Sequence, residues 1–196
     1  MLTQAIFINN MKKVYYKEVQ KFGSIPLYFV MGLIYISILG FFFYALINEF
    51  VYHGNAIKGH MTSDGLIISS VLTVVILMVA SYLLFGSKLI TEITAKSVNY
   101  RFPPFIKKNK IIDKESISSW EIRKYKPIKE YGGWGIRYSP KKKVLYGKKA
   151  AKHNSAVNVK GNIGLQLVFK NGKRLLIGTQ RQEAIRRAMK KMYNSK

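Results

Sequence analysis

Two long stretches without charged residues constrain this chain more than any other feature. Residues 26–47 and residues 66–86 contain no Asp, Glu, Lys, Arg or His. An α-helix needs roughly 20 residues to cross a hydrocarbon core of about 30 Å, and both stretches are long enough. A helix satisfies its own backbone hydrogen bonds, so such a segment is stable in lipid. We therefore predict two transmembrane helices rather than a buried helix pair in a soluble core.

The short connection at residues 48–65 makes these helices an antiparallel hairpin. Lysines precede the first stretch at Lys12, Lys13, Lys17 and Lys21, and basic residues are dense after Gly86, whereas the connection contains only Lys58. Positively charged flanks stay in the cytoplasm. We predict that both termini are cytoplasmic and that the connection faces the exterior.

Residues 1–25 show a helical pattern. The apolar run that follows them is too long for a secretory signal and has no cleavage pattern at its end. Apolar residues recur every three or four positions, and lysines form a separate stripe; the apolar positions are Ala5, Ile8, Met11, Tyr15, Val19 and Phe22. This spacing predicts an amphipathic helix. Two placements satisfy the same pattern: the membrane interface, or the surface of the cytoplasmic domain.

After Gly86 the apolar pattern changes to alternation, which is typical of strands. We predict strands at residues 89–94, 97–102, 105–111 and 117–125, with Pro103 and Pro104 interrupting between the second and the third. Residues 166–170 and 173–177 are expected to pair through a type I′ turn at Asn171-Gly172. Residues 87–196 are long enough for one domain.

The chain ends with a predicted amphipathic helix. Thr179 and Gln182 have the spacing of a capping box, and the apolar face that follows consists of Ile185, Ala188, Met189 and Met192. A helix at this position can cover the open end of a curled sheet. The fold class is thus an α+β membrane protein, with a helical hairpin followed by an antiparallel β barrel or sandwich that a C-terminal helix closes.

Three sequence strings carry a resemblance. They are Glu130-Tyr-Gly-Gly-Trp-Gly-Ile-Arg137, Gly161-Asn-Ile-Gly-Leu-Gln-Leu167 and Leu176-Ile-Gly-Thr-Gln-Arg181. With the order of spans, strands and terminal helix, they resemble an uncharacterised group of bacterial membrane proteins that carry a pleckstrin-homology-like domain after a membrane hairpin. The resemblance implies a location in the bacterial inner membrane, and it assigns no reaction, ligand or cofactor. The chain departs from the group between Tyr138 and Val157, where its loop is longer and more basic.

The segment Gly132-Gly133-Trp134-Gly135 has three glycines in four positions. Such a segment adopts backbone conformations closed to other residues or allows a close approach. Two interpretations are open: a bulged corner with Trp134 over the core, or an exposed tryptophan that contacts a membrane or a partner. Arg137, next to it, is a candidate to hold an anion.

Charge is the other strong signal. The chain has 33 Lys and Arg against 9 Asp and Glu, a net charge of +24. Six of the lysines are the candidate contacts with an anionic leaflet: Lys141, Lys142, Lys143, Lys148, Lys149 and Lys152. Tethering by the spans favours lipid as the anionic partner over nucleic acid. The oligomeric state is not determined by the sequence.

Catalytic and metal-binding patterns are weak. The chain has no cysteine. His53 and His60, near Glu49 and Asp64, lack the spacing of a metal site. Glu121 and Glu130 could form a carboxylate pair for acid–base chemistry, but nothing in the sequence brings them together. We expect no cofactor and no enzyme, but a non-catalytic binding or scaffolding module. The alternative is an adaptor that binds a peptide or another membrane protein through the Gly-Gly-Trp-Gly segment.

Overall fold

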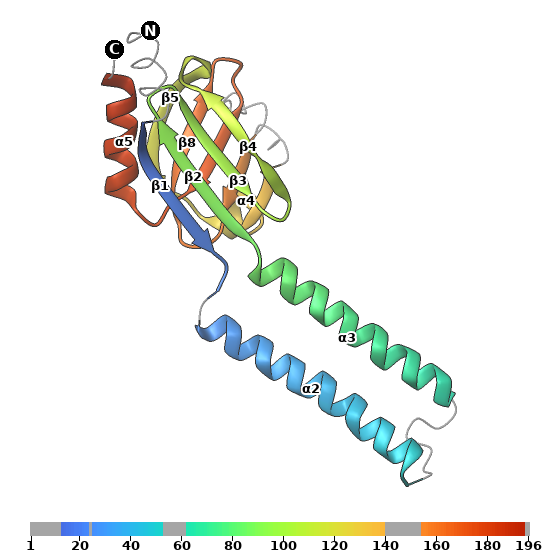
Figure 1. Cartoon of the computed structure of the whole chain (residues 1–196). Helices are drawn as coiled ribbons and strands as arrows, with labels where there is room; N and C mark the ends of the chain where they lie inside the picture. Colours follow the sequence, from blue (N-terminus) through green and yellow to red (C-terminus); the bar gives the residue numbers. More distant parts are fainter. Residues whose placement is uncertain (1–12, 24, 53–61, 140–153, 195–196) are drawn as a thin grey trace, which may run out of the picture. The chain divides into compact units, whose positions relative to one another are not determined.

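The computed structural model describes residues 13–23, 25–52, 62–139 and 154–194. These residues form two compact units (Figure 1). One unit is the segment Gly23–Gly86. The other combines the residues before Gly23 with those after Gly86. The helical unit is therefore an insertion in the sequence of the other unit.

The helical unit contains α2 (Ile25–Phe50) and α3 (Ser63–Phe85). Both are long and apolar enough to cross a membrane, and only 6% of the most apolar window of each helix is buried. The core helix of a soluble protein would be mostly buried instead. The two predicted helices are confirmed, each extended by a few residues toward the connection. Thr62 caps α3, because its Oγ1 accepts a hydrogen bond from the Gly65 N–H.

Contacts along the two helices show that they are antiparallel. At one end the rings of Tyr28 and Phe85 stack with centroids 5.0 Å apart. The hydroxyls of Tyr35 and Ser81 are hydrogen-bonded further along. At the other end Ser63 Oγ donates to Glu49 Oε1 at 2.6 Å. The predicted hairpin is thus present in this unit.

The first sheet, which we call sheet A, has four antiparallel strands in the order β1-β2-β3-β4. They are β1 (Val14–Lys21), β2 (Lys88–Thr94), β3 (Ser97–Phe102) and β4 (Ile106–Asp113). The strands predicted at β2, β3 and β4 are confirmed. The predicted face of β3 is confirmed as well, because Val98, Tyr100 and Phe102 all pack in the core.

The helix predicted within residues 1–25 is wrong where the structure describes this segment. Residues 14–21 form β1, and its alternate residues Tyr16, Glu18 and Gln20 are buried. The backbone of β1 pairs with β2, from Val14 opposite Thr94 to Lys21 opposite Lys88. An unpaired edge on β2 favours strand over helix here, because tertiary pairing outweighs a local pattern. Ala5, Ile8 and Met11 lie outside the described residues.

The second sheet, sheet B, has the strand order β5-β8-β9-β7-β6. Its strands are β5 (Ile117–Lys124), β6 (Gly135–Ser139), β7 (Asn154–Asn158), β8 (Ile163–Phe169) and β9 (Arg174–Gly178). The sheet is antiparallel as predicted except at one pair, because β7 and β9 are parallel. Among the described residues the strands form two separate sheets and no closed barrel.

The β8–β9 hairpin is confirmed, but its turn differs from the predicted type I′. Gly172 N donates to Phe169 O, and Phe169 N donates to Lys173 O, so the loop has three residues. Gly172 has a φ of +79°. A three-residue loop that ends in a left-handed glycine is the next most common hairpin connection after the two-residue turns.

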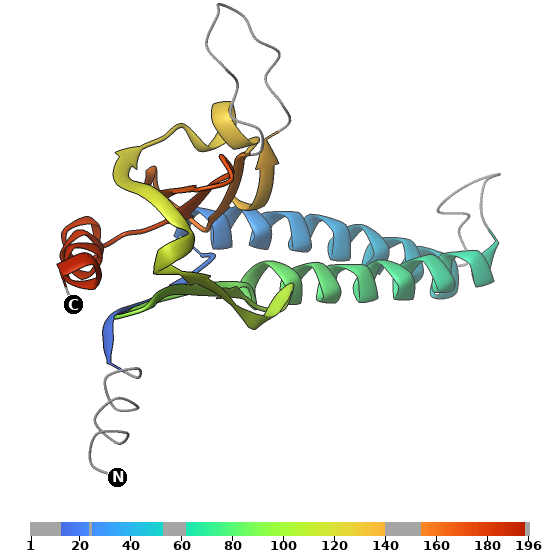
Figure 2. The same ribbon diagram turned by 90° about the horizontal axis from the view of Figure 1, so that it is seen from above.

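The core lies between the two sheets and under α5 (Gln182–Asn194). Figure 2 shows the sheets as separate layers with α5 beside them. The predicted face of α5 is confirmed, because Ile185, Ala188, Met189 and Met192 are all buried. The predicted capping box is wrong. The helix begins at Gln182, and Thr179 Oγ1 accepts a hydrogen bond from the Arg181 N–H.

Candidate functional site

Each of the five strands of sheet B has one of its ends at the same end of the sheet, which we call the glycine end. Lys124 pairs with Ile163, Gly135 with Asn158, and Gly178 with Gly164. Since β7 runs parallel to β9, Asn158 and Gly178 end their strands on the same side. The loops at the glycine end therefore come from all five strands of sheet B.

The Gly-Gly-Trp-Gly segment lies at the glycine end, after the short helix α4 (Pro127–Tyr131). Gly132 is the left-handed C-cap of α4, with φ +73°, and Gly133 N donates to Pro127 O at 3.0 Å. Gly135 has φ +109°, and its N–H donates to Asn158 Oδ1 at 2.9 Å. All three glycines thus adopt conformations that favour glycine, as the sequence predicts.

Trp134 is 39% exposed and belongs to neither hydrophobic cluster of buried residues. Its indole Nε1 donates to Gly161 O at 3.1 Å, and its carbonyl accepts a hydrogen bond from Arg137 Nε at 2.8 Å. The ring is therefore held in place with part of its surface in solvent. This position favours the second interpretation of the segment, an exposed tryptophan.

The three strings that carry the resemblance meet at the glycine end. Trp134 binds Gly161, and Gln180 Nε2 donates to Lys160 O at 2.8 Å. A Cβ on Gly161 would lie 2.8 Å from Gln180 Nε2, and the φ of Gly161 is +76°. Gly161 is thus the contact point between residues separated by tens of positions in the chain.

A polar cluster lies beside this contact. Arg123 Nη2 bonds Glu130 Oε2 at 2.9 Å, Gln166 Oε1 at 3.1 Å and the Tyr131 hydroxyl at 3.2 Å. Burial by itself lowers the pKa of Arg123, but Glu130 and Tyr131 raise it above its usual value. Glu130 is hydrogen-bonded to Arg123, and Glu121 lies at an exposed position on β5. Sequence reasoning missed Arg123, because nothing in its local pattern marks it.

Asn158, also missed, connects the glycine segment to the sheet. It is fully buried, and its Nδ2 donates to the Tyr125 hydroxyl at 2.9 Å while its Oδ1 accepts from Gly135. Burial raises the pKa of Tyr125 and that of Tyr131, whose rings meet edge to face. A single asparagine in a strand gives no sequence signal for this role.

A buried carboxylate on β1 links the start of the chain to the glycine end. Glu18 is 5% exposed; it accepts hydrogen bonds from the Tyr16 hydroxyl, from Thr179 Oγ1 at 2.9 Å and from Gln180 N at 2.9 Å. Gln20 Nε2 donates to Gly178 O at 2.7 Å. Burial and the bond to Glu18 raise the pKa of Tyr16 above its usual value. These bonds fasten β1 to the β9–α5 connection.

The predicted lysine contacts fall outside the described residues, which exclude residues 140–153. The strands that flank this segment are β6 and β7, paired from Gly135 opposite Asn158 to Ser139 opposite Asn154. Ser139 and Asn154 are therefore at the end of sheet B opposite the glycine end. Trp134 and the two flanks of the lysine segment are separated by the length of β6, about 17 Å at 3.4 Å per residue.

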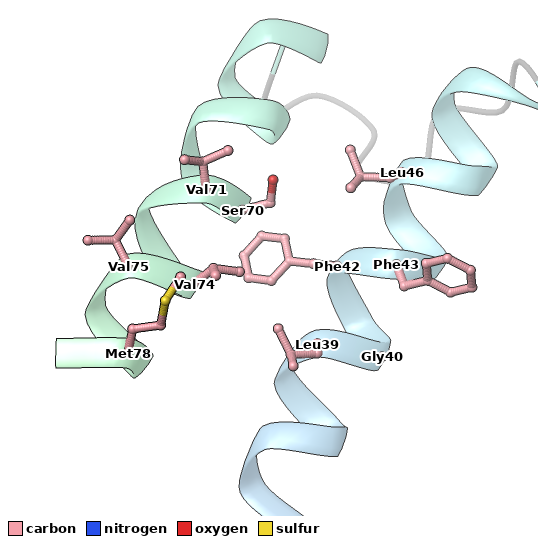
Figure 3. A pocket seen from close by; sticks show the side chains of 10 residues that line it. All are labelled: Leu39, Gly40, Phe42, Phe43, Leu46, Ser70, Val71, Val74, Val75 and Met78. Carbon is pink, nitrogen blue, oxygen red and sulfur yellow. The ribbon is translucent and has the colours of Figure 1, made fainter. Parts of the chain in front are cut away.

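The helical unit has an open groove of about 660 Å³ (Figure 3). It is lined by Leu39, Gly40, Phe42, Phe43 and Leu46 of α2 and by Ser70, Val71, Val74, Val75 and Met78 of α3. Its only hydroxyl among these residues, Ser70 Oγ, donates to Ile67 O within its own helix. The groove thus offers apolar contact and no polar chemistry.

His53 and His60, considered for a metal, lie outside the described residues, as does His153. Among the residues that the structure describes, no three His, Cys, Asp or Glu side chains gather as a metal site would require.

Comparison of the chain with protein-family models, with curated proteins and with solved structures gives no match.

Proposed function

We propose that this protein is a membrane-anchored, non-catalytic binding or scaffolding module whose basic two-sheet unit contacts the anionic inner leaflet or an anionic ligand. The observation that carries the proposal is the position of the helical hairpin in the sequence. It is inserted between β1 and β2, and the strand residues that precede and follow it, Lys21 and Lys88, are paired in sheet A. A bilayer-spanning hairpin leaves and returns to one unit at one place, so it keeps that unit at the membrane.

The distribution of charge supports an anionic partner. The chain has 33 basic and 9 acidic residues. Of the acidic residues in the two-sheet unit, Glu18 is buried in hydrogen bonds, and Glu92 and Glu130 are paired with Lys17 and Arg123. Such a surface attracts the phosphates of an anionic leaflet over roughly a Debye length of 8 Å.

The same charges support the direction of threading. Lysines on both sides of the hairpin favour a cytoplasmic two-sheet unit in a bacterial inner membrane. A meander of four strands, a second sheet and a closing C-terminal helix also support a pleckstrin-homology-like fold for this unit. In that interpretation β6 and β7 are an addition beyond β9.

The carboxylates of the glycine end are hydrogen-bonded within the protein, which supports binding rather than catalysis. Glu130 and Arg123 are engaged with each other, and Glu18 accepts three hydrogen bonds. A general acid or base needs a proton that substrate can reach. These carboxylates instead hold the fold of the glycine end.

An adaptor that binds a peptide or another membrane protein is the second candidate. The exposed, hydrogen-bonded indole of Trp134 favours it, because fixed aromatic rings are preferred anchors at protein interfaces.

Amide hydrogen exchange of the full chain tests the proposed function. The protein would be placed in nanodiscs of phosphatidylcholine alone and of phosphatidylcholine mixed with phosphatidylglycerol. We expect slower exchange in some part of residues 87–196 in the anionic discs, and we expect added salt to reverse it. Equal exchange in the two discs at low salt would refute contact with the leaflet.

A further inference from the structure

We propose that the glycine end of sheet B is the face that the two-sheet unit turns to the bilayer. In this arrangement Trp134 and Ile128 lie at headgroup level, and Lys126, Lys129 and Lys160 lie against lipid phosphates. The inference rests on the proposed function and adds to it the surface that makes the contact. It differs from the expectation that the lysines of residues 141–152 make it.

The first argument comes from where the chain leaves the two-sheet unit. Gln20 is the penultimate residue of β1, and its side chain donates to Gly178 O, the last residue of β9. Lys21 and Lys88, the strand residues that flank the insertion, are paired beside it. The glycine end of sheet B and the exit of the chain toward the apolar helices are therefore on the same end of this unit.

The second argument is the exposure of large apolar side chains at this end. Ile128 on α4 is 69% exposed and Trp134 is 39% exposed, three residues beyond the end of α4. Trp is enriched at the membrane–water interface, where its ring is apolar and its N–H is polar. Because the indole N–H already binds Gly161 O, the ring loses little freedom when it enters the interface.

The third argument is the charge around these two side chains. Lys126, Lys129 on α4 and Lys160 are all exposed at the glycine end. Glu130, the acidic residue among them, accepts hydrogen bonds from Arg123 and from the Lys126 N–H. An apolar centre with a lysine border is the composition that binds an anionic interface.

Charge alone does not choose between the two ends, because the lysines of residues 141–152 follow Ser139 at the opposite end. That end differs in two respects. The exposed carboxylates Asp113 and Glu115 lie there, at the end of β4 and before the start of β5. The exit of the chain, marked by the paired residues Lys21 and Lys88, is not at that end. The apolar side chains and the exit of the chain thus select the glycine end.

The test uses the full chain with Trp120→Phe, which leaves Trp134 as the single tryptophan of the two in the sequence. In nanodiscs that contain phosphatidylglycerol, we expect the emission of Trp134 to shift to shorter wavelength and to be quenched by lipids brominated near the headgroup. In phosphatidylcholine discs, or at high salt, the shift and the quenching should be smaller.

Two sets of charge reversals give a matched comparison. The first set is Lys126→Glu, Lys129→Glu and Lys160→Glu, and the second is Lys141→Glu, Lys142→Glu and Lys143→Glu. We expect the first set to abolish the quenching and the second to leave most of it. Ile128→Ser, at an exposed position that folding does not need, should reduce the quenching without a change in the near-UV circular dichroism.

The outcomes separate this inference from the proposed function. If hydrogen exchange slows in anionic discs but the emission of Trp134 is the same in both discs, the contact exists and another face makes it. Loss of quenching with the second set alone would likewise overturn the inference. If exchange slows nowhere in the anionic discs, contact with the leaflet is refuted, and this inference falls with it.

Discussion

At the scale of single residues, the carboxylate of Glu18 is the shared acceptor of a buried hydrogen-bond cluster. It joins a residue that precedes both apolar helices to Thr179 and Gln180, which follow every strand of the fold. A buried carboxylate is costly unless donors surround it, and here three donors do. Its value to the fold therefore depends on the whole cluster.

Replacement of Glu18 by Ala tests this dependence. The change removes the carboxylate that accepts from the Gln180 N–H and from the Tyr16 and Thr179 hydroxyls, and leaves these two hydroxyls only their bond to each other. We expect the free energy of unfolding to fall by about 2–3 kcal/mol. Denaturant titration of the full chain in detergent, followed by the fluorescence of Trp120 and Trp134, measures it. The control is Glu121→Ala at an exposed position, expected within about 0.5 kcal/mol of the wild type. Equal effects of the two changes would contradict a role for Glu18.

Tyrosines set the response to alkaline pH. Burial raises the pKa of Tyr16, Tyr125 and Tyr131 in the folded state. The unfolded chain then loses these protons first, at its usual pKa of about 10. The stability that these groups contribute is complete below pH 10 and is lost as the pH rises above it.

We therefore expect the tyrosinate absorbance of these three residues to appear together with loss of the near-UV circular dichroism. If all 13 tyrosines titrate while the circular dichroism stays native, the three side chains are not protected as the structure indicates.

At the scale of elements, the sequence was sufficient where a pattern is local. The alternation in residues 97–102 and the helical face from Ile185 to Met192 predict β3 and α5, because each element turns its apolar side chains to one core. The pattern of residues 14–21 fits two periods, since Tyr15 and Val19 match a helix while Tyr16 and Glu18 alternate with exposed residues. Only the open edge of β2 decides between them, and it is distant in sequence.

The candidate site shows the same division. The left-handed glycines of residues 132–135 could be predicted, because such spacing has few backbone explanations. The contacts of Trp134 with Gly161, and of Gln180 with Lys160, depend on the parallel pairing of β7 with β9, which no local signal indicates.

The position of β1 predicts the behaviour of two truncated proteins. Residues 87–196 alone lack β1 and leave the edge of β2 and the partners of Glu18 exposed. We expect this fragment to aggregate or to lack cooperative unfolding. Replacement of residues 23–86 by Asn-Gly, so that Phe22 leads through the turn to Ser87, keeps Lys21 opposite Lys88 across a four-residue loop.

We expect this shortened protein to be soluble and to unfold in one cooperative transition, followed by circular dichroism. If both proteins behave alike, β1 does not complete the fold.

At the scale of the whole molecule, one feature of chain order determines which segments lie on the same side of a membrane. A pair of apolar helices interrupts a sheet between two strands that are neighbours in that sheet. If the helices cross a bilayer, β1 and everything after Gly86 must lie on the same side of it. The connection between the helices must then lie on the other side. This consequence does not depend on the count of lysines.

Labelling of single cysteines tests this central claim most directly, because the chain has no cysteine of its own. Three variants of the full chain are needed: Lys17→Cys on β1, Asn55→Cys in the connection and Glu121→Cys on β5. Each would be treated, in intact bacterial cells and after permeabilisation, with a maleimide that cannot cross the membrane. We expect Asn55→Cys to react in intact cells, and Lys17→Cys and Glu121→Cys to react only after permeabilisation. Reaction of residues 17 and 121 on opposite sides, or of all three on one side, would contradict the account.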